Sequence, residues 1–395
     1  MSLKKSKAHK KITLLEEETL LTVFRFRQLS HSLLVKSLLT VKPMRGSYFA
    51  INLYKNVSNL EKLGFLKSSS FGSFPVCKYC YLTNKGLQYV YGILNLKLGD
   101  FNDGFKSEGF FEYEIYYPPQ KFIDHHMLVT EVLVELERLS DEYEYCHEIK
   151  WRHNLYCSRK FEVGGRQWTL KADAEFSTPN GYGFIEADRG TEDSNDLFEK
   201  FSLYSKYFEH LQAEGQVLPS TILFIYKTTE QWAFRMRSNT ILNAFYKVLS
   251  KWTDKVNLII IEDPKHVRDL VRSEYEKKSR FESMRTLAGL RNKSHKEIKW
   301  NIIYTNDNNE IIIHQRCDFV DSATFLVLYK LCAQAISQNI NIQIVLYTLF
   351  IKPFKFNFTG LDFLNEKMRS ILAEAKWVEI NDGLVTYYDS HLRLY

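Results

Sequence analysis

The chain has 395 residues, of which 45% are hydrophobic and 25% charged, a composition that excludes wholesale disorder and favours two or three domains. Its formal charge is +6, but residues 1–97 hold 16 Lys and Arg against four acidic residues, a charge of +12, so the remainder carries −6. A polyanion partner is therefore expected at the N-terminal part. Scattered cysteines and the lack of an apolar run of roughly 20 residues predict a cytoplasmic protein without a membrane role.

Three helices followed by two strands are predicted at the start of the chain. The helices are expected at residues 14–26, from Ser30 to about residue 39, and at 47–63, and the strands at 65–68 and 76–82. Thr13 is a suitable N-cap for the first helix, and Gly64 suits the end of the third. This order predicts a winged helix-turn-helix over residues 12–97.

The third predicted helix carries the features expected of a DNA-recognition helix. Apolar residues recur on one face, and the opposite face is rich in Asn and Lys, which can contact adenine edges and phosphates. The predicted DNA contacts on this helix are Asn52, Lys55, Asn59 and Lys62. Arg45, Tyr48 and Lys78 are predicted to contact the phosphate backbone of the DNA. A winged helix that docks onto another protein is the alternative interpretation.

The middle of the chain predicts a mixed domain. After a polar linker at residues 98–119, the domain is expected over 120–265. Its predicted elements are a helix at 122–139, strands at 148–151, 167–176 and 183–188, a helix at 196–214 and a strand at 221–226. This order is typical of the restriction-endonuclease-like fold, in which a carboxylate on the second strand and a Glu-x-Lys on the third converge on a divalent metal.

Candidate catalytic residues occupy the matching positions. Asp173 and Glu186 could share Mg²⁺ through carboxylate oxygens. Asp188 stands where the pattern has Lys, and an acid there cannot stabilise a phosphate as a cation would. Lys200, on the following helix, could reach back to supply that charge. The alternative is that Glu186, Asp188 and Arg189 form a buried ion-pair network that only fastens the strand.

The run Phe184-Ile185-Glu186-Ala187-Asp188-Arg189-Gly190-Thr191-Glu192, followed by Lys200, Tyr204 and Tyr207 on a helix, resembles the replication-relaxation family of plasmid and mobile-element proteins. The resemblance extends over roughly residues 12–265. It implies a role in plasmid replication, or in relaxing or nicking plasmid DNA, and a core similar to the PD-(D/E)xK nucleases. Asp188 in place of Lys belongs to the family's own pattern.

The last third predicts a helical connector at 266–297 and a small α+β domain at 298–395. Its expected elements are strands at 300–304, 310–314 and 342–349, helices at 322–338 and 361–375, and a hairpin around residues 381–383. The chain as a whole is thus predicted to be an α+β multidomain protein.

Three functions follow from these features. The chain is expected to bind double-stranded DNA in plasmid or mobile-element replication, relaxation or mobilisation. The alternatives are a Mg²⁺-dependent endonuclease that nicks DNA and a winged-helix transcriptional regulator. Other replication or mobilisation proteins and a second copy of the chain are the further partners considered.

Overall fold

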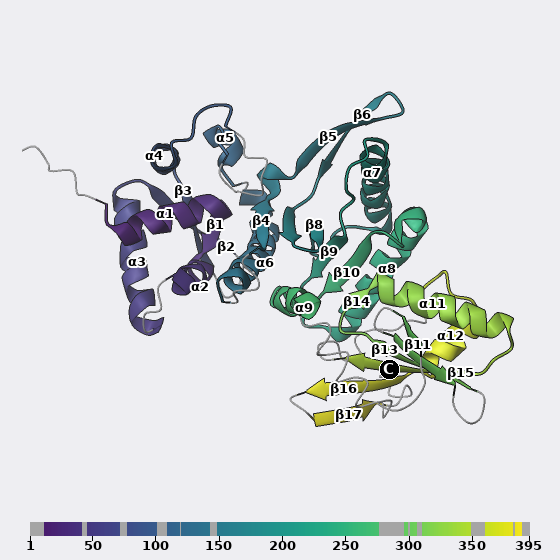
Figure 1. Ribbon diagram of the computed structural model, residues 1–395. Helices are drawn as coiled ribbons and strands as arrows, with labels where there is room; N and C mark the ends of the chain where they lie inside the picture. Colours follow the sequence, from purple (N-terminus) through teal and green to yellow (C-terminus); the bar gives the residue numbers. More distant parts are fainter. Residues whose placement is uncertain are drawn as a thin grey trace, which may run out of the picture. The chain divides into compact units, whose positions relative to one another are not determined.

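The computed structural model describes residues 12–41, 46–71, 77–100, 109–118, 120–142, 148–275, 296–298, 301–305, 310–348, 360–381 and 384–388 (Figure 1). Helices and strands are mixed throughout, which confirms the α+β class. The chain divides into two compact units, Met1–Tyr156 and Cys157–Tyr395. The sequence instead predicts boundaries at a linker, 98–119, and at a helical connector, 266–297.

The elements of the first unit are α1 (Leu14–Phe26), β1 (Gln28–Ser30), α2 (His31–Val41), α3 (Gly46–Lys62), β2 (Leu66–Phe71), β3 (Cys77–Leu82), α4 (Asn84–Leu94), α5 (Tyr113–Tyr116), α6 (Ile123–Glu142) and β4 (Lys150–His153). Helices α1 and α3 begin and end within one residue of the predicted positions. Thr13 and Glu16 form a capping box at α1, and Thr83 accepts a hydrogen bond from the Gly86 amide at α4. Gly64, with φ +76°, follows α3.

The strands of the first unit form an antiparallel sheet in the order β1-β3-β2. The sequence analysis missed β1, a strand of three residues between α1 and α2. Its pairing with β3 ties the first two helices to the β2–β3 hairpin, because Leu29 lies opposite Cys80. All three residues of β1 are buried, so the strand belongs to the core of the unit.

The segment that was predicted to be a linker is in part packed structure. Within residues 98–119 it contains α5, where Tyr116 is buried and stacks on Phe24 with ring centroids 5.7 Å apart. Arg27 donates to the carbonyls of Ile115, Tyr116 and Tyr117 at 2.9, 2.7 and 2.9 Å. A polar, glycine-containing composition predicted the segment's irregular backbone but not these long-range contacts.

Helix α6 packs within the first unit, against α2 and β1. An ion pair of 3.3 Å joins Lys36 on α2 to the buried Glu135 on α6. The sequence analysis had grouped this helix with the strands that follow it, because strand and helix order alone does not say which face a helix covers.

The elements of the second unit are β5 (Ser158–Val163), β6 (Arg166–Lys171), β7 (Ala174–Thr178), β8 (Gly181–Asp188), α7 (Ser194–Ala213), β9 (Thr221–Tyr226), α8 (Gln231–Val248), β10 (Asn257–Ile261), α9 (His266–Tyr275), β11 (Lys296–Ile298), β12 (Asn301–Thr305), β13 (Ile311–Arg316), β14 (Val320–Asp321), α11 (Ser322–Ser337), β15 (Ile342–Thr348), α12 (Glu366–Ala373), β16 (Lys376–Asn381) and β17 (Leu384–Tyr388). The single strand predicted at 167–176 is two strands, β6 and β7, which are separated at Ala172 and Asp173. Strand β5 and helix α8 were not predicted.

A sheet in the second unit contains β14, β10, β9, β8 and β7 as neighbours in that order. Strands β8, β9 and β10 are parallel, and α7 and α8 are the crossover helices between them. Because such crossovers are right-handed, both helices cover the same face, and they pack against each other. The apolar runs of β9 and β10 are typical of strands buried on both faces.

A second sheet has the order β11-β12-β13-β15-β16-β17. Strand β14 follows β13 in the chain but belongs to the first sheet, where it pairs with β10 and Val320 lies opposite Ile260. Helix α11 begins directly after β14 and contacts both β10 and α12. One hydrophobic cluster includes Phe224 of the first sheet, Leu328 of α11 and Leu346 of the second. The two sheets therefore share a core.

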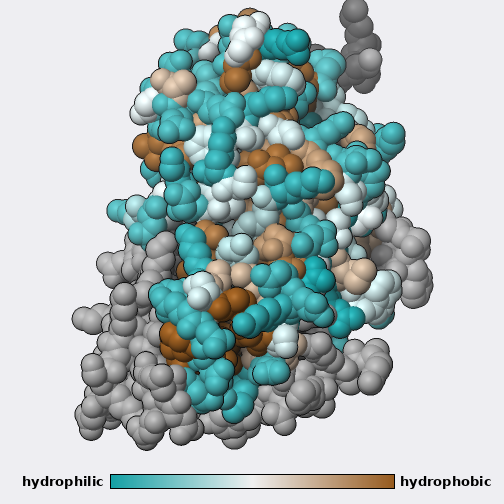
Figure 2. Space-filling view, turned by 90° about the vertical axis from the view of Figure 1, so that its right-hand side faces the viewer, coloured by the Kyte–Doolittle hydropathy of each residue, from teal (hydrophilic) through white to brown (hydrophobic). Residues whose placement is uncertain are grey.

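Hydrophilic side chains cover most of the described surface on the face in Figure 2, with hydrophobic ones in smaller patches between them. Trp232 and Met236, one turn apart on α8, are 62% and 59% exposed.

Within the part of the chain that the structure describes, no helix is long and apolar enough to cross a membrane.

Candidate functional site

Strand β8 presents two acidic side chains to the helices that cover the sheet. Glu186 and Asp188 are two residues apart and therefore point to the same face of β8. Both are buried, with exposed fractions of 3% and 1%. A buried carboxylate requires a charged or hydrogen-bonding partner, and α7 and α8 supply one each.

Glu186 is held by two side chains of α7. The Lys200 ammonium lies 3.1 Å from one carboxylate oxygen, and the Tyr204 hydroxyl donates a hydrogen bond to the other. Lys200 also pairs with Glu192 at 2.7 Å, in the loop before α7. Lys200, which the sequence predicts to reach back from this helix and supply positive charge, contacts Glu186 in the structure. The spacing of four residues places Lys200 and Tyr204 on one face of the helix.

Burial changes the titration of this cluster. Burial and, to a lesser degree, the nearby charge of Asp173 raise the pKa of Glu186 to about 7 against the opposing effect of Lys200. Burial would lower the pKa of Lys200, but the charges of Glu186 and Glu192 outweigh it and raise that pKa. The pKa of the buried Tyr204 hydroxyl is raised well above 10.0, so this group stays a hydrogen-bond donor.

Asp188 belongs to a neighbouring ion pair. Arg237 of α8 donates from Nε to the Asp188 carboxylate and from Nη1 to the Glu192 carbonyl, the latter at 2.8 Å. The other Asp188 oxygen accepts from the Gly190 amide at 2.7 Å, where φ is +72°. Arg237 thereby fastens the loop between β8 and α7. The sequence analysis missed Arg237 because it lies on α8, which was not predicted.

Asp173 completes the group of predicted catalytic residues. It lies between β6 and β7, where its carboxylate accepts a hydrogen bond of 2.9 Å from the Ala187 amide on β8. Its charge acts on both Glu186 and Lys200. The structure therefore brings Asp173, Glu186 and Lys200 together and places Asp188 in the separate pair with Arg237.

The carboxylates of Asp173 and Glu186 are oxygen ligands of the kind that Mg²⁺ takes. In this arrangement both oxygens of Glu186 already accept hydrogen bonds, from Tyr204 and Lys200. The described residues contain no group of three or more His, Cys, Asp or Glu side chains placed to hold a metal ion. The positive charge beside Glu186 is that of the Lys200 ammonium, which takes the place that a metal ion would hold. The side chains as arranged therefore do not fit a Mg²⁺ site.

The second candidate surface lies on α3 in the first unit. Lys55 and Lys62 are exposed, as is Lys78 on β3, whereas Asn52 and Asn59 are half-buried. Arg45 lies outside the described residues, as does the side chain of Tyr48, whose backbone belongs to α3.

Two residues of this surface were missed because they are apolar. Ile51 is 54% exposed and Tyr54 is 47% exposed. With Lys55 and Lys62 they follow one face of α3, opposite the buried Leu53, Val57 and Leu60. The helical spacing of Leu53, Val57 and Leu60 predicts that positions 51 and 54 lie on the opposite, exposed face. The Tyr54 ring also contacts His31 of α2, with ring centroids 5.6 Å apart.

Comparison with known proteins gives one match. Residues 54–219 match the model of the replication-relaxation family, which confirms the resemblance predicted from the sequence over that segment. The matched segment is shorter than the 12–265 expected, but it contains the cluster of Asp173, Glu186 and Lys200. Neither a curated protein nor a solved structure matches the chain.

Proposed function

With residues 54–219 matching the replication-relaxation family, we propose that the chain is a double-stranded-DNA-binding protein of plasmid or mobile-element replication, relaxation or mobilisation. Residues 12–97, within the first unit, form its winged helix-turn-helix, and α3 is the recognition helix. The observation that carries the proposal is the exposed face of α3, where Lys55 and Lys62 flank Ile51 and Tyr54. Lysines neutralise phosphates, and an exposed aliphatic side chain suits the thymine methyl group.

The surroundings of α3 support the same orientation. His31, at the start of α2, lies with Nε2 3.4 Å from the Ser68 hydroxyl of β2. The same ring contacts Tyr54 of α3. The β2–β3 hairpin that would form the wing therefore lies near α3, and it carries the exposed Lys78.

Salt dependence tests this proposal. Binding of a labelled 30-base-pair duplex should weaken with salt, and the variant with Lys55→Ala and Lys62→Ala should reduce the log–log slope by about 2, since each phosphate contact contributes roughly 0.9. Fluorescence anisotropy measures both slopes. Lys97→Ala, an exposed lysine beyond α4, is the matched control. An unchanged slope in the double variant would mean that α3 does not face the phosphates.

Hydrolysis of a phosphodiester bond is a second candidate function. It is favoured by one observation, the convergence of Asp173, Glu186 and Lys200 at the end of β8. Such a group of two carboxylates and an ammonium is the composition of PD-(D/E)xK sites, with the lysine supplied by α7. A transcriptional regulator is the remaining alternative, and it requires neither the cluster nor any cleavage.

Nicking of supercoiled plasmid with Mg²⁺ or Mn²⁺ tests the second candidate. If the chain cleaves, Glu186→Gln should slow nicking by on the order of 100-fold or more. Glu209→Gln, an exposed ion-paired carboxylate further along α7, should leave the rate unchanged. Duplex binding without nicking by the wild-type chain would reject the nuclease and leave the DNA-binding proposal intact.

A further inference from the structure

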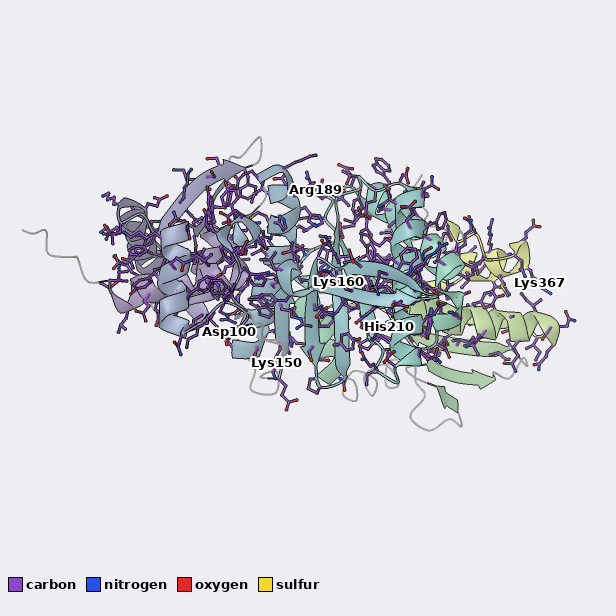
Figure 3. The ribbon with its side chains drawn as sticks, turned by 90° about the horizontal axis from the view of Figure 1, so that it is seen from above. Asp100, Lys150, Lys160, Arg189, His210 and Lys367 are labelled. Atoms are coloured by element: carbon purple, nitrogen blue, oxygen red, sulfur yellow. The ribbon has the colours of Figure 1, made fainter. Side chains whose placement is uncertain are left out.

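A cleft in the second unit lies between the β5–β6 hairpin and α7. Figure 3 labels Lys160 on the hairpin and His210 on α7, and these two elements lie against each other. The cleft has a volume of about 630 Å³, within the range of small-molecule sites. Its lining residues are Trp168, Thr169, Glu192, Asp196, Glu199, Lys200, Ser202, Leu203 and Lys206.

Two lysines of α7 line the cleft in different surroundings. Lys200 is the residue that pairs with the buried Glu186. The Lys206 ammonium lies 3.3 Å from the centroid of the Trp168 ring. The two lysines are six positions apart on α7, a rise of roughly 9 Å. The cleft therefore leads from an aromatic platform to the candidate catalytic cluster.

The acidic residues that line the cleft are not equivalent. Glu192 is paired with Lys200, and the Asp196 carboxylate accepts from the Asp193 amide in the capping box of α7. Glu199 is exposed on the cleft face of α7. Its carboxylate can accept a hydrogen bond from a ligand amino group, as acidic side chains do from cytosine N4.

We propose that this cleft binds one unpaired nucleotide of DNA whose base carries an exocyclic amino group. The base stacks on Trp168, its amino group donates to Glu199, and Lys206 moves from the ring to the adjoining phosphate. Indole rings are sequence-tolerant stacking platforms, and the lysine stem is long and flexible enough for this exchange. The inference rests on the proposed DNA-binding function and adds a site for unpaired DNA beside the carboxylate cluster.

The test uses the full chain and labelled 15-nucleotide oligo(dC) and oligo(dT). Oligo(dC) should bind more tightly than oligo(dT), Trp168→Ala should weaken oligo(dC) binding about 10-fold or more, and Trp168→Phe should retain most of it. Glu199→Gln should reduce the difference between the two oligonucleotides. Trp232→Ala, which removes an exposed indole on α8 outside the lining of the cleft, is the matched control.

The outcomes separate this inference from the proposed function. If the chain binds the duplex with the salt dependence predicted above, but Trp168→Ala leaves oligo(dC) binding unchanged, only the cleft proposal is overturned. If the wild-type chain does not bind the duplex at all, the proposed function is overturned instead. Free dCMP that competes at the concentration of oligo(dC) needed for half-saturation would identify a site for free nucleotides and reject the DNA assignment. Equal effects of Trp168→Ala and Trp168→Phe would reject stacking.

Discussion

Arg27→Met is expected to lower the unfolding free energy of the first unit by about 3–5 kcal/mol, because three carbonyls lose a buried donor at roughly 1–3 kcal/mol each. Arg27 is 5% exposed and has φ +70°, and its guanidinium contacts three carbonyls of the segment around α5. It also lies 3.2 Å from the Asn154 side-chain oxygen. Burial lowers the pKa of Arg27 only to about 10, so the group stays charged at neutral pH.

The physical reason is the fork geometry of the guanidinium. Methionine fills a similar volume but donates no hydrogen bond, so the carbonyls of Ile115, Tyr116 and Tyr117 would lose a shared donor. Hydrogen exchange of amides 113–117 and the melting temperature of the full chain measure the effect, and a shift of about 10 °C is expected. Lys97→Met, at an exposed position, should change neither. A melting temperature within about 2 °C of wild type would show that water replaces the guanidinium at little cost.

Lys200→Met should destabilise the second unit strongly above neutral pH and weakly in acid. At pH 8 the variant leaves the Glu186 carboxylate buried without its cation, at a cost of about 3–5 kcal/mol. Burial raises the pKa of Glu186 from 4.5 to about 7, so between these pH values the folded chain holds a proton that the unfolded chain has lost. The free energy of unfolding therefore falls as pH rises from about 4.5 to about 7. Without Lys200 the pKa rises further, so the neutral carboxyl persists at pH 5.

Denaturant unfolding at pH 5 and pH 8 measures this difference. Adding Glu186→Gln to Lys200→Met should restore most of the lost stability at pH 8, because no buried charge then remains at position 186. Lys265→Met, at an exposed lysine of the same unit, serves as the control. Equal destabilisation at both pH values would mean that Lys200 acts through the packing of its stem and not through its charge.

The exposed face of α3, which we propose binds DNA, shows how much helical periodicity alone predicts. The repeat of Leu53, Val57 and Leu60 predicts which face of α3 is buried, and the structure agrees. The same repeat predicts that positions 51 and 54 are exposed, and Ile51 and Tyr54 are 54% and 47% exposed. Hydropathy alone assigns such residues to the core, whereas their position on the helix places them on its exposed face.

The carboxylate cluster was predicted in part. Alternation along β8 places Glu186 and Asp188 on one face, and helical spacing brings Lys200 and Tyr204 to the same side of α7. The partner of Asp188 was not predicted, since Arg237 follows it by 49 residues in the chain. The apolar face of its helix, which Phe234, Ile241 and Phe245 form, is interrupted by the polar Ser238.

The sequence by itself determined the helices with local caps and the apolar strands, because both depend on residues within a few positions of one another. It also determined the basic charge of residues 1–97. The tertiary structure alone decided the short strands β1 and β14, which exist through their distant partners β3 and β10. It also decided the packing of the predicted linker on Arg27 and the cleft beside Lys200. These features depend on contacts between residues remote in sequence, for which no local spacing carries a signal.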